Sequence, residues 1–273
     1  MGERWSEVQI LSPRPFKFMN ILISNDDGYF SDGIQCLRDS LLDAGHQVFM
    51  VAPDRDYSAC SMSITLRQPV TIRSVANNEY AVSGTPVDCV AVALGGLIKG
   101  AIDLVVSGIN NGANLSDDVF YSGTAAAAME ARRLKYPSIA VSIPQVKPKH
   151  FATAASVVNS LIDKIETLPN KEELAFLNVN VPDVTLDELK GLKSTALGLR
   201  NKPEPHREEM SEKGVRHCWL GGVGSFVEPE SQGQMNLIYD HQCIEEGYAS
   251  ITPIKSEWLH QPFLNQCQQW LDD

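Results

Sequence analysis

The sequence predicts an α/β protein built on one doubly wound, mostly parallel sheet, followed by a C-terminal extension of different character. Three observations predict this class. Short apolar runs of strand length alternate with segments of helical period up to about residue 182. Three of these runs end in polar loops of Asp, Asn, Ser and Gly. After residue 183 the alternation stops, and the stretch 200–235 is rich in Gly, Pro and charge.

The first βαβ unit is the clearest part of this pattern. MNILIS (19–24) is an apolar run that ends in NDDG, which is typical of a buried strand and a turn. Residues 32–44 carry apolar side chains at a helical period, and Gly45 is placed as the C-terminal cap. QVFMVA (47–52) is the second strand. A strand, a helix and a strand within about 35 residues predict a parallel pair.

The elements that follow continue this alternation. We expect strands near 69–73 and 79–83, a helix from Pro86 to about Ile98, a strand over 102–108, a helix from Ser122 to about Leu134, a strand over 137–143, a helix over 150–167 and a strand over 175–181. Further on we expect a strand pair near 217–227 with a glycine turn at 221–224, a strand over 245–254 and a helix over 256–272. The domain boundaries expected are a loose leader over 1–18 and one α/β domain over 19–273, in which 200–273 is the extension.

Composition excludes several classes of protein. The chain has 273 residues, with 23 Lys and Arg against 34 Asp and Glu, so its formal net charge is −11. Such a balance argues against a protein that grips long nucleic acid or docks on an anionic membrane. The sequence contains no apolar run of about 18 residues, so no membrane span is expected. Its six cysteines form no C-x-x-C signature. A cytoplasmic location is expected.

An acidic pair follows the first strand. Asp26 and Asp27 are adjacent carboxylates at a strand end, where they repel each other unless a positive charge lies between them. A hard divalent cation supplies that charge and takes oxygen ligands. The alternative is a turn acid that caps the next helix. With Gly28 and an apolar strand beside the pair, the metal interpretation is favoured.

Neutral oxygen donors follow the other two strands. Ser58 lies in the loop after the second strand, and Asn110 and Asn114 lie in the loop after the strand at 102–108. The carboxyl ends of parallel strands meet at one edge of the sheet, so these side chains should share a crevice with the acidic pair. The resulting set suits Mg²⁺, Mn²⁺ or Ca²⁺ and suits zinc poorly.

An anion site is expected beside this set. Ser122, Gly123 and Thr124 open an Ala-rich helix, whose N-terminus offers N–H groups, hydroxyls and the positive end of the dipole. Ordinary N-capping explains the same residues equally well. The six histidines lie outside the three loops. A metal site beside an anion site implies phosphoryl chemistry.

The motifs together resemble a known family. ILISNDDG, VAPDRDYSACSMSITL, SGTPVDCV, VVSGINNGANLSDDVFYSGTAAAAMEA and EEGYASITP occur in this order, and the chain resembles the SurE family of survival-protein nucleotidases from about residue 19 to 270. The resemblance implies a Rossmann-like fold and a metal-dependent phosphatase. Its implied substrates are nucleoside 5′- and 3′-monophosphates, with some activity on short polyphosphate. The C-terminal extension is implied to pair or swap between subunits in a homodimer or homotetramer.

The resemblance also assigns roles to residues. It implies metal ligands at Asp26, Asp27, Ser58 and Asn110, and phosphate contacts at Asn114, Ser122, Gly123 and Thr124. We expect one divalent ion, Mg²⁺ or Mn²⁺, with Ca²⁺ as a non-catalytic occupant. Asp26 and Asp27 are the expected catalytic residues, because the metal activates a water that attacks phosphorus and Asp27 orients that water or takes its proton. Three positions depart from the usual pattern, namely Ala113, Ser116 and Tyr57, and they bear on substrate preference.

Three other functions compete with this one. A receiver domain also has an acidic pair after its first strand, but it needs a phosphoacceptor Asp after a central strand, where this chain has Ser107-Gly108-Ile109-Asn110. A phosphatase of the haloacid dehalogenase type needs D-x-D, which Asn25-Asp26-Asp27 is not. A nucleotide-binding module would bind nucleotide and release no phosphate.

Overall fold

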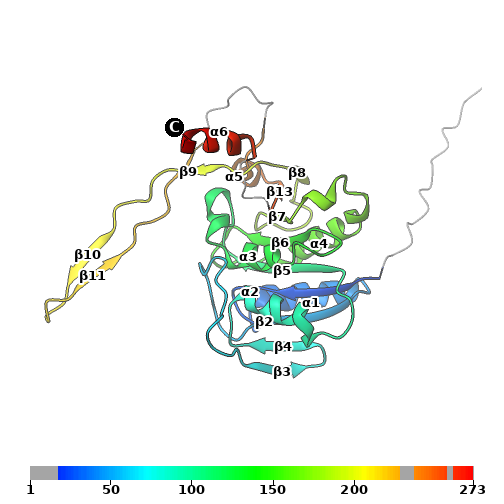
Figure 1. Ribbon diagram of the computed structural model, residues 1–273. Helices are drawn as coiled ribbons and strands as arrows, with labels where there is room; N and C mark the ends of the chain where they lie inside the picture. Colours follow the sequence, from blue (N-terminus) through cyan, green and yellow to red (C-terminus); the bar gives the residue numbers. More distant parts are fainter. Residues whose placement is uncertain (1–17, 228–236, 257–260, 273) are drawn as a thin grey trace, which may run out of the picture.

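The computed structural model describes residues 18–227, 237–256 and 261–272. Its centre is one sheet of nine strands (Figure 1). These strands are β1 (Asn20–Ser24), β2 (Gln47–Pro53), β3 (Ile72–Ala76), β4 (Glu79–Val82), β5 (Leu104–Asn111), β6 (Ser138–Ile143), β7 (Phe176–Asn180), β8 (Leu192–Ser194) and β13 (Ala249–Ile254). Their order across the sheet is β3-β4-β2-β1-β5-β6-β7-β13-β8.

The pairing confirms a doubly wound, mostly parallel sheet. β4, β2, β1, β5, β6 and β7 are parallel neighbours, and β8 is parallel to β13. The antiparallel pairs lie toward the sides, where β3 joins β4 and β13 joins β7. Since β2 and β5 flank β1, the loops that follow these three strands leave the same edge of the sheet. This edge positions the site.

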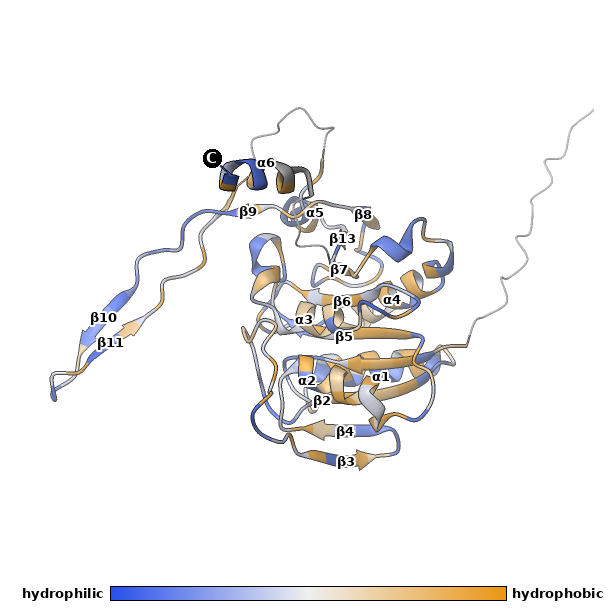
Figure 2. Cartoon of the chain, viewed as in Figure 1, coloured by the Kyte–Doolittle hydropathy of each residue, from blue (hydrophilic) through white to orange (hydrophobic). Residues whose placement is uncertain are grey.

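Helices cover both faces of the sheet. The main ones are α1 (Asp32–Asp43), α2 (Pro86–Val92), α3 (Gly123–Glu130) and α4 (Phe151–Ile162). Successive side chains of a strand point to opposite faces, and β1 shows this directly. Ile21 and Ile23 pack in one core cluster with residues of α1 and α4, whereas Leu22 packs in another with residues of α2 and α3. With both faces covered, the central strands carry apolar residues toward both faces, and much of β5 is orange in Figure 2.

Several helices differ in extent from the sequence expectation. α3 ends at Glu130 and α4 at Ile162, each a few residues early. The strand expected over 245–254 begins only at Ala249, because Asp240–Glu245 forms α5 and Gly247 closes that helix with a φ of +85°. Short helical turns complete the described chain at 93–97, 116–120, 165–167 and 171–173. The final helix, α6, spans Gln261–Asp272, and residues 257–260 of the expected helix lie outside the described residues.

Residues 199–227 form an arm that leaves the body (Figure 1), whereas β13, later in the expected extension, belongs to the central sheet. The arm contains β9 (Leu199–Arg200), β10 (Arg207–Met210), β11 (Arg216–Trp219) and β12 (Phe226–Val227). The expected strand pair at 217–227 is wrong. β11 pairs with β10 through a turn that contains Gly214, and β12 pairs instead with β9. Figure 2 shows that β10 is largely hydrophilic.

The glycine run 221–224 does not form the expected turn. Here two segments of the arm pass very close to each other, and the Glu204 N–H donates to the Gly222 carbonyl at 2.9 Å. A Cβ at Gly221 would lie 1.8 Å from the carbonyl oxygen of Glu204. The glycines therefore permit a close backbone approach rather than a reversal of the chain.

Two further expectations concern the N-terminal leader and membrane-spanning helices. The leader expected over 1–18 lies outside the described residues, except for Phe18. Among the residues that the structure describes, no helix is long and apolar enough to cross a membrane.

Candidate active site

The loops after β1, β2 and β5 meet at one edge of the sheet. Direct contacts join them. The Tyr57 N–H donates to the Asp26 carbonyl at 2.8 Å, and the Asn111 N–H donates to Asp27 Oδ2 at 3.0 Å. Gly28, with a φ of +95°, lies so close to Arg55 that a Cβ would be 3.1 Å from its backbone. The three loops therefore meet as the strand order predicts, with the loop after β1 in contact with each of the other two.

Asp26 is the most buried of the four predicted metal ligands, with 3% of its surface exposed. Thr124, at the start of α3, donates its hydroxyl to Asp26 Oδ1 at 2.5 Å. Burial raises the pKa of Asp26, while the Thr124 hydroxyl and main-chain hydrogen bonds of Thr124 and Asp26 oppose that rise. The positive end of α3 thus faces a carboxylate that the fold has removed from water.

Gly123 makes this approach possible. A Cβ at this position would lie 2.8 Å from the Asp26 Cβ and 3.0 Å from Asp26 Oδ2. No side chain fits in that space without displacing the carboxylate. The first turn of α3 therefore packs directly on Asp26 because residue 123 is glycine.

Asp27 is more accessible and is oriented by the loop after β5. Burial raises the pKa of Asp27 to about 6; the hydrogen bond from Asn111 opposes this rise, and the charges of Asp26 and Asp56 add to it. Among the described residues, no Lys, Arg or His forms an ion pair with Asp26 or Asp27. The site therefore concentrates negative charge without a protein cation to balance it.

Ser58 is exposed and held by a residue that the sequence analysis missed. Both its N–H and its hydroxyl donate to Asp56 Oδ1, each at 2.7 Å. Asp56 thereby fixes the loop in an Asx-type turn and adds a third carboxylate near the pair. The D-x-S spacing in the loop after β2 was the available signal for this contact.

Asn110 lies at the end of β5 and is 8% exposed. Its Nδ2 donates to the Gly112 carbonyl at 3.1 Å. This bond orients the amide and leaves Oδ1 as its ligand atom for a cation.

Asn114 belongs to a buried polar network rather than to an open loop surface. Its Nδ2 donates to Ser142 Oγ at 2.7 Å, and its N–H donates to Asn180 Oδ1 at 3.0 Å. Its carbonyl accepts from Asn178 and Asn180. The network ties the loop after β5 to β6 and β7, and sequence reasoning missed its three partners. A phosphate contact by Asn114 stays a prediction.

Two side chains at the start of α3 already form hydrogen bonds within the protein. Ser122 accepts a hydrogen bond from the Ala125 N–H at 3.0 Å, so it is the N-cap of the helix. Thr124 is committed to Asp26. Capping therefore explains Ser122, and the anion site proposed over residues 122–124 depends on the backbone N–H groups of this helix end and stays a prediction.

The residues present fit a hard divalent cation. The set consists of carboxylate, hydroxyl and amide oxygens, which Mg²⁺ and Mn²⁺ prefer. Burial raises the pKa of both aspartates and the Asp56 carboxylate adds to this rise, so their ionised forms are the ones that a cation would stabilise. Beside them, Asn25 Oδ1 is buried without a hydrogen-bond partner in the described part of the chain. These features define the class of an α/β protein with an oxygen-rich cation site at the carboxyl edge of a parallel sheet.

Comparisons with known proteins identify the family within this class. The family described as "Survival protein SurE" matches residues 21–204, and the chain belongs to the SurE family. A protein of Actinobacillus succinogenes named 5′-nucleotidase SurE is 43% identical over 93% of this chain and 99% of its own length. A protein of the same name from Haemophilus influenzae is 44% identical over 93% of this chain and 98% of its own length.

A solved structure agrees with this assignment. The crystal structure of the SurE protein from Aquifex aeolicus is similar at a TM-score of 0.79 and 34% identity, and the match covers 93% of this chain and all of that one. The family resemblance and the α/β fold expected from the sequence are confirmed.

Proposed function

We propose that this chain is a 5′-nucleotidase, a metal-dependent phosphatase that hydrolyses nucleoside 5′- and 3′-monophosphates to nucleoside and phosphate. The observation that carries the proposal is the pair Asp26 and Asp27, whose pKa values are raised and which have no cationic partner in the described chain. The names of relatives that are 43–44% identical over most of this chain support the same activity.

The proposed ligands are Asp26, Asp27, Ser58 and Asn110, which would hold one Mg²⁺ or Mn²⁺ ion. When bound, such an ion polarises a phosphoryl oxygen and supplies an activated water. Asp27 receives the Asn111 N–H on Oδ2, so its Oδ1 remains to ligate the ion or to take a proton. Ca²⁺ fits the same oxygens as a non-catalytic occupant.

The remaining residues position these groups. Thr124 orients the carboxylate of Asp26, and Asp56 holds the loop of Ser58. In the proposal, the N-terminus of α3 at Ser122, Gly123 and Thr124 stabilises phosphate oxygens as charge develops on them. Asn114 contributes from the adjacent loop.

The structure bears on one competing mechanism. A phosphatase with an aspartyl-phosphate intermediate needs an exposed carboxylate as nucleophile. Asp26 is 3% exposed, accepts the Thr124 hydroxyl and packs against Gly123. It is therefore poorly placed to attack phosphorus, and an attempt to trap a covalent phosphate on the more accessible Asp27 would separate this mechanism from attack by water.

Charge sets an expectation for substrate size. With a net charge of −11, the positive potential that holds phosphate comes from the metal and from the end of α3. A long polyanion meets repulsion outside the crevice, so we expect polyphosphate to be a weaker substrate than a mononucleotide.

We also propose that residues 200–273 assemble the chain into a homodimer or homotetramer. The arm leaves the body, and Trp219, Leu220 and Val223 on it are exposed. Light scattering of the full chain, compared with a chain lacking the arm, tests this assembly. The single domain over 19–273 and the cytoplasmic location stay predictions.

Phosphate release from a panel of substrates tests the activity. The panel contains 5′- and 3′-nucleoside monophosphates and short polyphosphate, each with Mg²⁺, Mn²⁺ or excess EDTA. We expect release from mononucleotides with either metal and none with EDTA. Undiminished release in excess EDTA would contradict the role of the metal, and nucleotide binding without release would indicate a binding module.

A further inference from the structure

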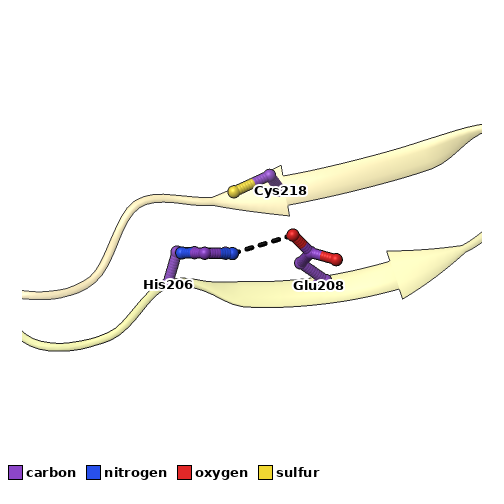
Figure 3. A group of neighbouring side chains, drawn as sticks. All are labelled: His206, Glu208 and Cys218. Carbon is purple, nitrogen blue, oxygen red and sulfur yellow. Dashed lines mark hydrogen bonds and ion pairs between the residues drawn. The ribbon is translucent and has the colours of Figure 1, made fainter.

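A second group of potential metal ligands lies on the arm, away from the site described above. It consists of His206, Glu208 and Cys218 (Figure 3). Glu208 and Cys218 are directly opposed in the β10–β11 register, so their side chains share a face of the hairpin. His206 precedes Glu208 by two residues along the strand direction and lies on that same face.

The ligand atoms of these residues are already close together. One atom from each, namely an imidazole nitrogen, a carboxylate oxygen and the thiol sulfur, lies within 4.8 Å of the other two. His206 Nε2 is 2.8 Å from Glu208 Oε1. Ligands around a tetrahedral Zn²⁺ ion lie about 2.0–2.3 Å from it, which places them between three and four ångströms apart. Because all three side chains are exposed, small rotations reach that arrangement.

One of the two Glu208 carboxylate oxygens remains available to a cation. Arg216 approaches Glu208 Oε2 at 3.7 Å, whereas Oε1 faces His206. The hairpin also keeps another histidine apart from the group. His217 opposes Glu209 in the register and therefore points to the other face.

We propose that His206, Glu208 and Cys218 form a binding site for a borderline-soft transition cation of the Zn²⁺ class. The mixed nitrogen, oxygen and sulfur set selects such an ion over Mg²⁺, which the oxygen-only site prefers. Binding releases the thiol proton of Cys218 to solvent and forms a bond from its sulfur to the metal. Three protein ligands leave a fourth position for water. The ion joins β10 to β11 across the hairpin and does not depend on the proposed nucleotidase activity.

Titration with Co²⁺ tests the site, because a thiolate bonded to Co²⁺ gives a charge-transfer absorbance that oxygen ligands do not give. The full chain is first supplied with excess Mg²⁺, which occupies the oxygen-rich site. We expect a thiolate band that saturates at one Co²⁺ per chain and disappears when Zn²⁺ is added in competition. Zn²⁺ should also slow tryptic cleavage at Lys213 in the hairpin turn, since the metal holds the strands together.

Matched variants separate this site from other thiols and histidines. C218S should abolish the band, and H206A should weaken Co²⁺ binding by about tenfold or more, because one of three ligands is lost. H217A changes a histidine on the opposite face of the same strand and should leave the titration unchanged. C60S removes the thiol that lies beside Asp26 and Gly123 and should also leave the band intact. Circular dichroism verifies that each variant is folded.

Three results would overturn the proposal. They are a wild-type chain without a thiolate band, a band that survives C218S, and a band that is lost in C60S. A failed nucleotidase assay has no bearing on this titration, so the two proposals fail separately.

Discussion

The sheet edge and the arm hairpin both gather proposed cation ligands, but they hold them in opposite ways. At the sheet edge, Asp26 is buried and packed against Gly123, and its hydrogen-bond partner is 98 positions away in the sequence. On the hairpin, His206, Glu208 and Cys218 are exposed; Glu208 and Cys218 are paired across β10 and β11, and His206 directly precedes β10. The first set is organised by the whole core, whereas the second is organised by one local register.

This difference teaches why the two sites suit different ions. Burial withholds water from Asp26 and Asp27, so the fold carries an electrostatic cost that a hard cation offsets. The hairpin ligands remain solvated without metal and carry no such cost. Their selectivity comes from the chemistry of nitrogen and sulfur rather than from burial.

The largest effect that sharpens the comparison is expected from Asp27→Asn. The variant keeps the shape of the side chain but loses the charged ligand, so turnover should fall by about 10³-fold or more. Phosphate release under saturating Mg²⁺ measures this loss. Glu208→Gln on the hairpin is the control and should retain wild-type turnover. Equal activity of the two variants would remove the distinction between the sites.

The next effect tests whether packing orients the buried ligand. Thr124→Val removes the hydroxyl that donates to Asp26 Oδ1 and keeps the volume. Loss of such a supporting hydrogen bond should reduce metal affinity or activity by about 10–100-fold. Thr124→Ser should restore most of it. The Mg²⁺ dependence of the rate measures both variants, and a Thr124→Val variant with unchanged Mg²⁺ dependence would contradict the positioning role.

Acid should weaken the sheet-edge site in a metal-dependent way. The pKa of Asp27 is raised to about 6, and only its ionised form binds a cation. With limiting Mg²⁺, kcat/KM should therefore fall about tenfold per pH unit below that value. Saturating Mg²⁺ competes with the proton and should move the midpoint to lower pH. A midpoint that ignores Mg²⁺ concentration would rule out Asp27 as the titrating ligand.

Close packing at Gly123 predicts an effect on stability. In Gly123→Ala the new Cβ would meet the Asp26 Cβ at 2.8 Å, so we expect a loss of about 1–3 kcal/mol of unfolding free energy. Gly95→Ala is the matched control, because no atom lies within 4 Å of its added Cβ. Denaturant unfolding measures both. An unchanged unfolding free energy in Gly123→Ala would show that the N-terminus of α3 shifts to accommodate the added Cβ.

The smallest expected effect is a gain in stability rather than a loss. The raised pKa of Asp27 means that its ionisation at pH 7 destabilises the metal-free fold, a contribution that is lost as protons bind. Asp27→Asn should therefore raise the metal-free Tm by about 2 °C, or about 1 kcal/mol for a chain of this size. This advantage should shrink as pH falls from about 6 toward 4. Differential scanning calorimetry checks it, and Mg²⁺ should stabilise only the wild-type chain.

Local patterns predicted much of this molecule. The β1–α1–β2 unit follows from hydrophobic period and a glycine cap. Asp26 and Asp27 are predicted as metal ligands because an acidic pair directly follows an apolar strand, and that role stays a prediction. The glycine run 221–224 misled for a physical reason, since glycine permits both a turn and a close approach of two backbones. Sequence alone does not tell these uses apart.

The sequence by itself determined the order of the elements, the oxygen character of the site and the strand ends that carry it. Only the tertiary structure decided that Thr124 holds Asp26, that Asp56 holds Ser58 and that Asn114 is tied to β6 and β7. It also brought His206 beside Cys218. Hydrophobic periodicity indicates which face of its own helix or strand a residue occupies. Partners distant along the chain become neighbours only when the sheet and its register are assembled.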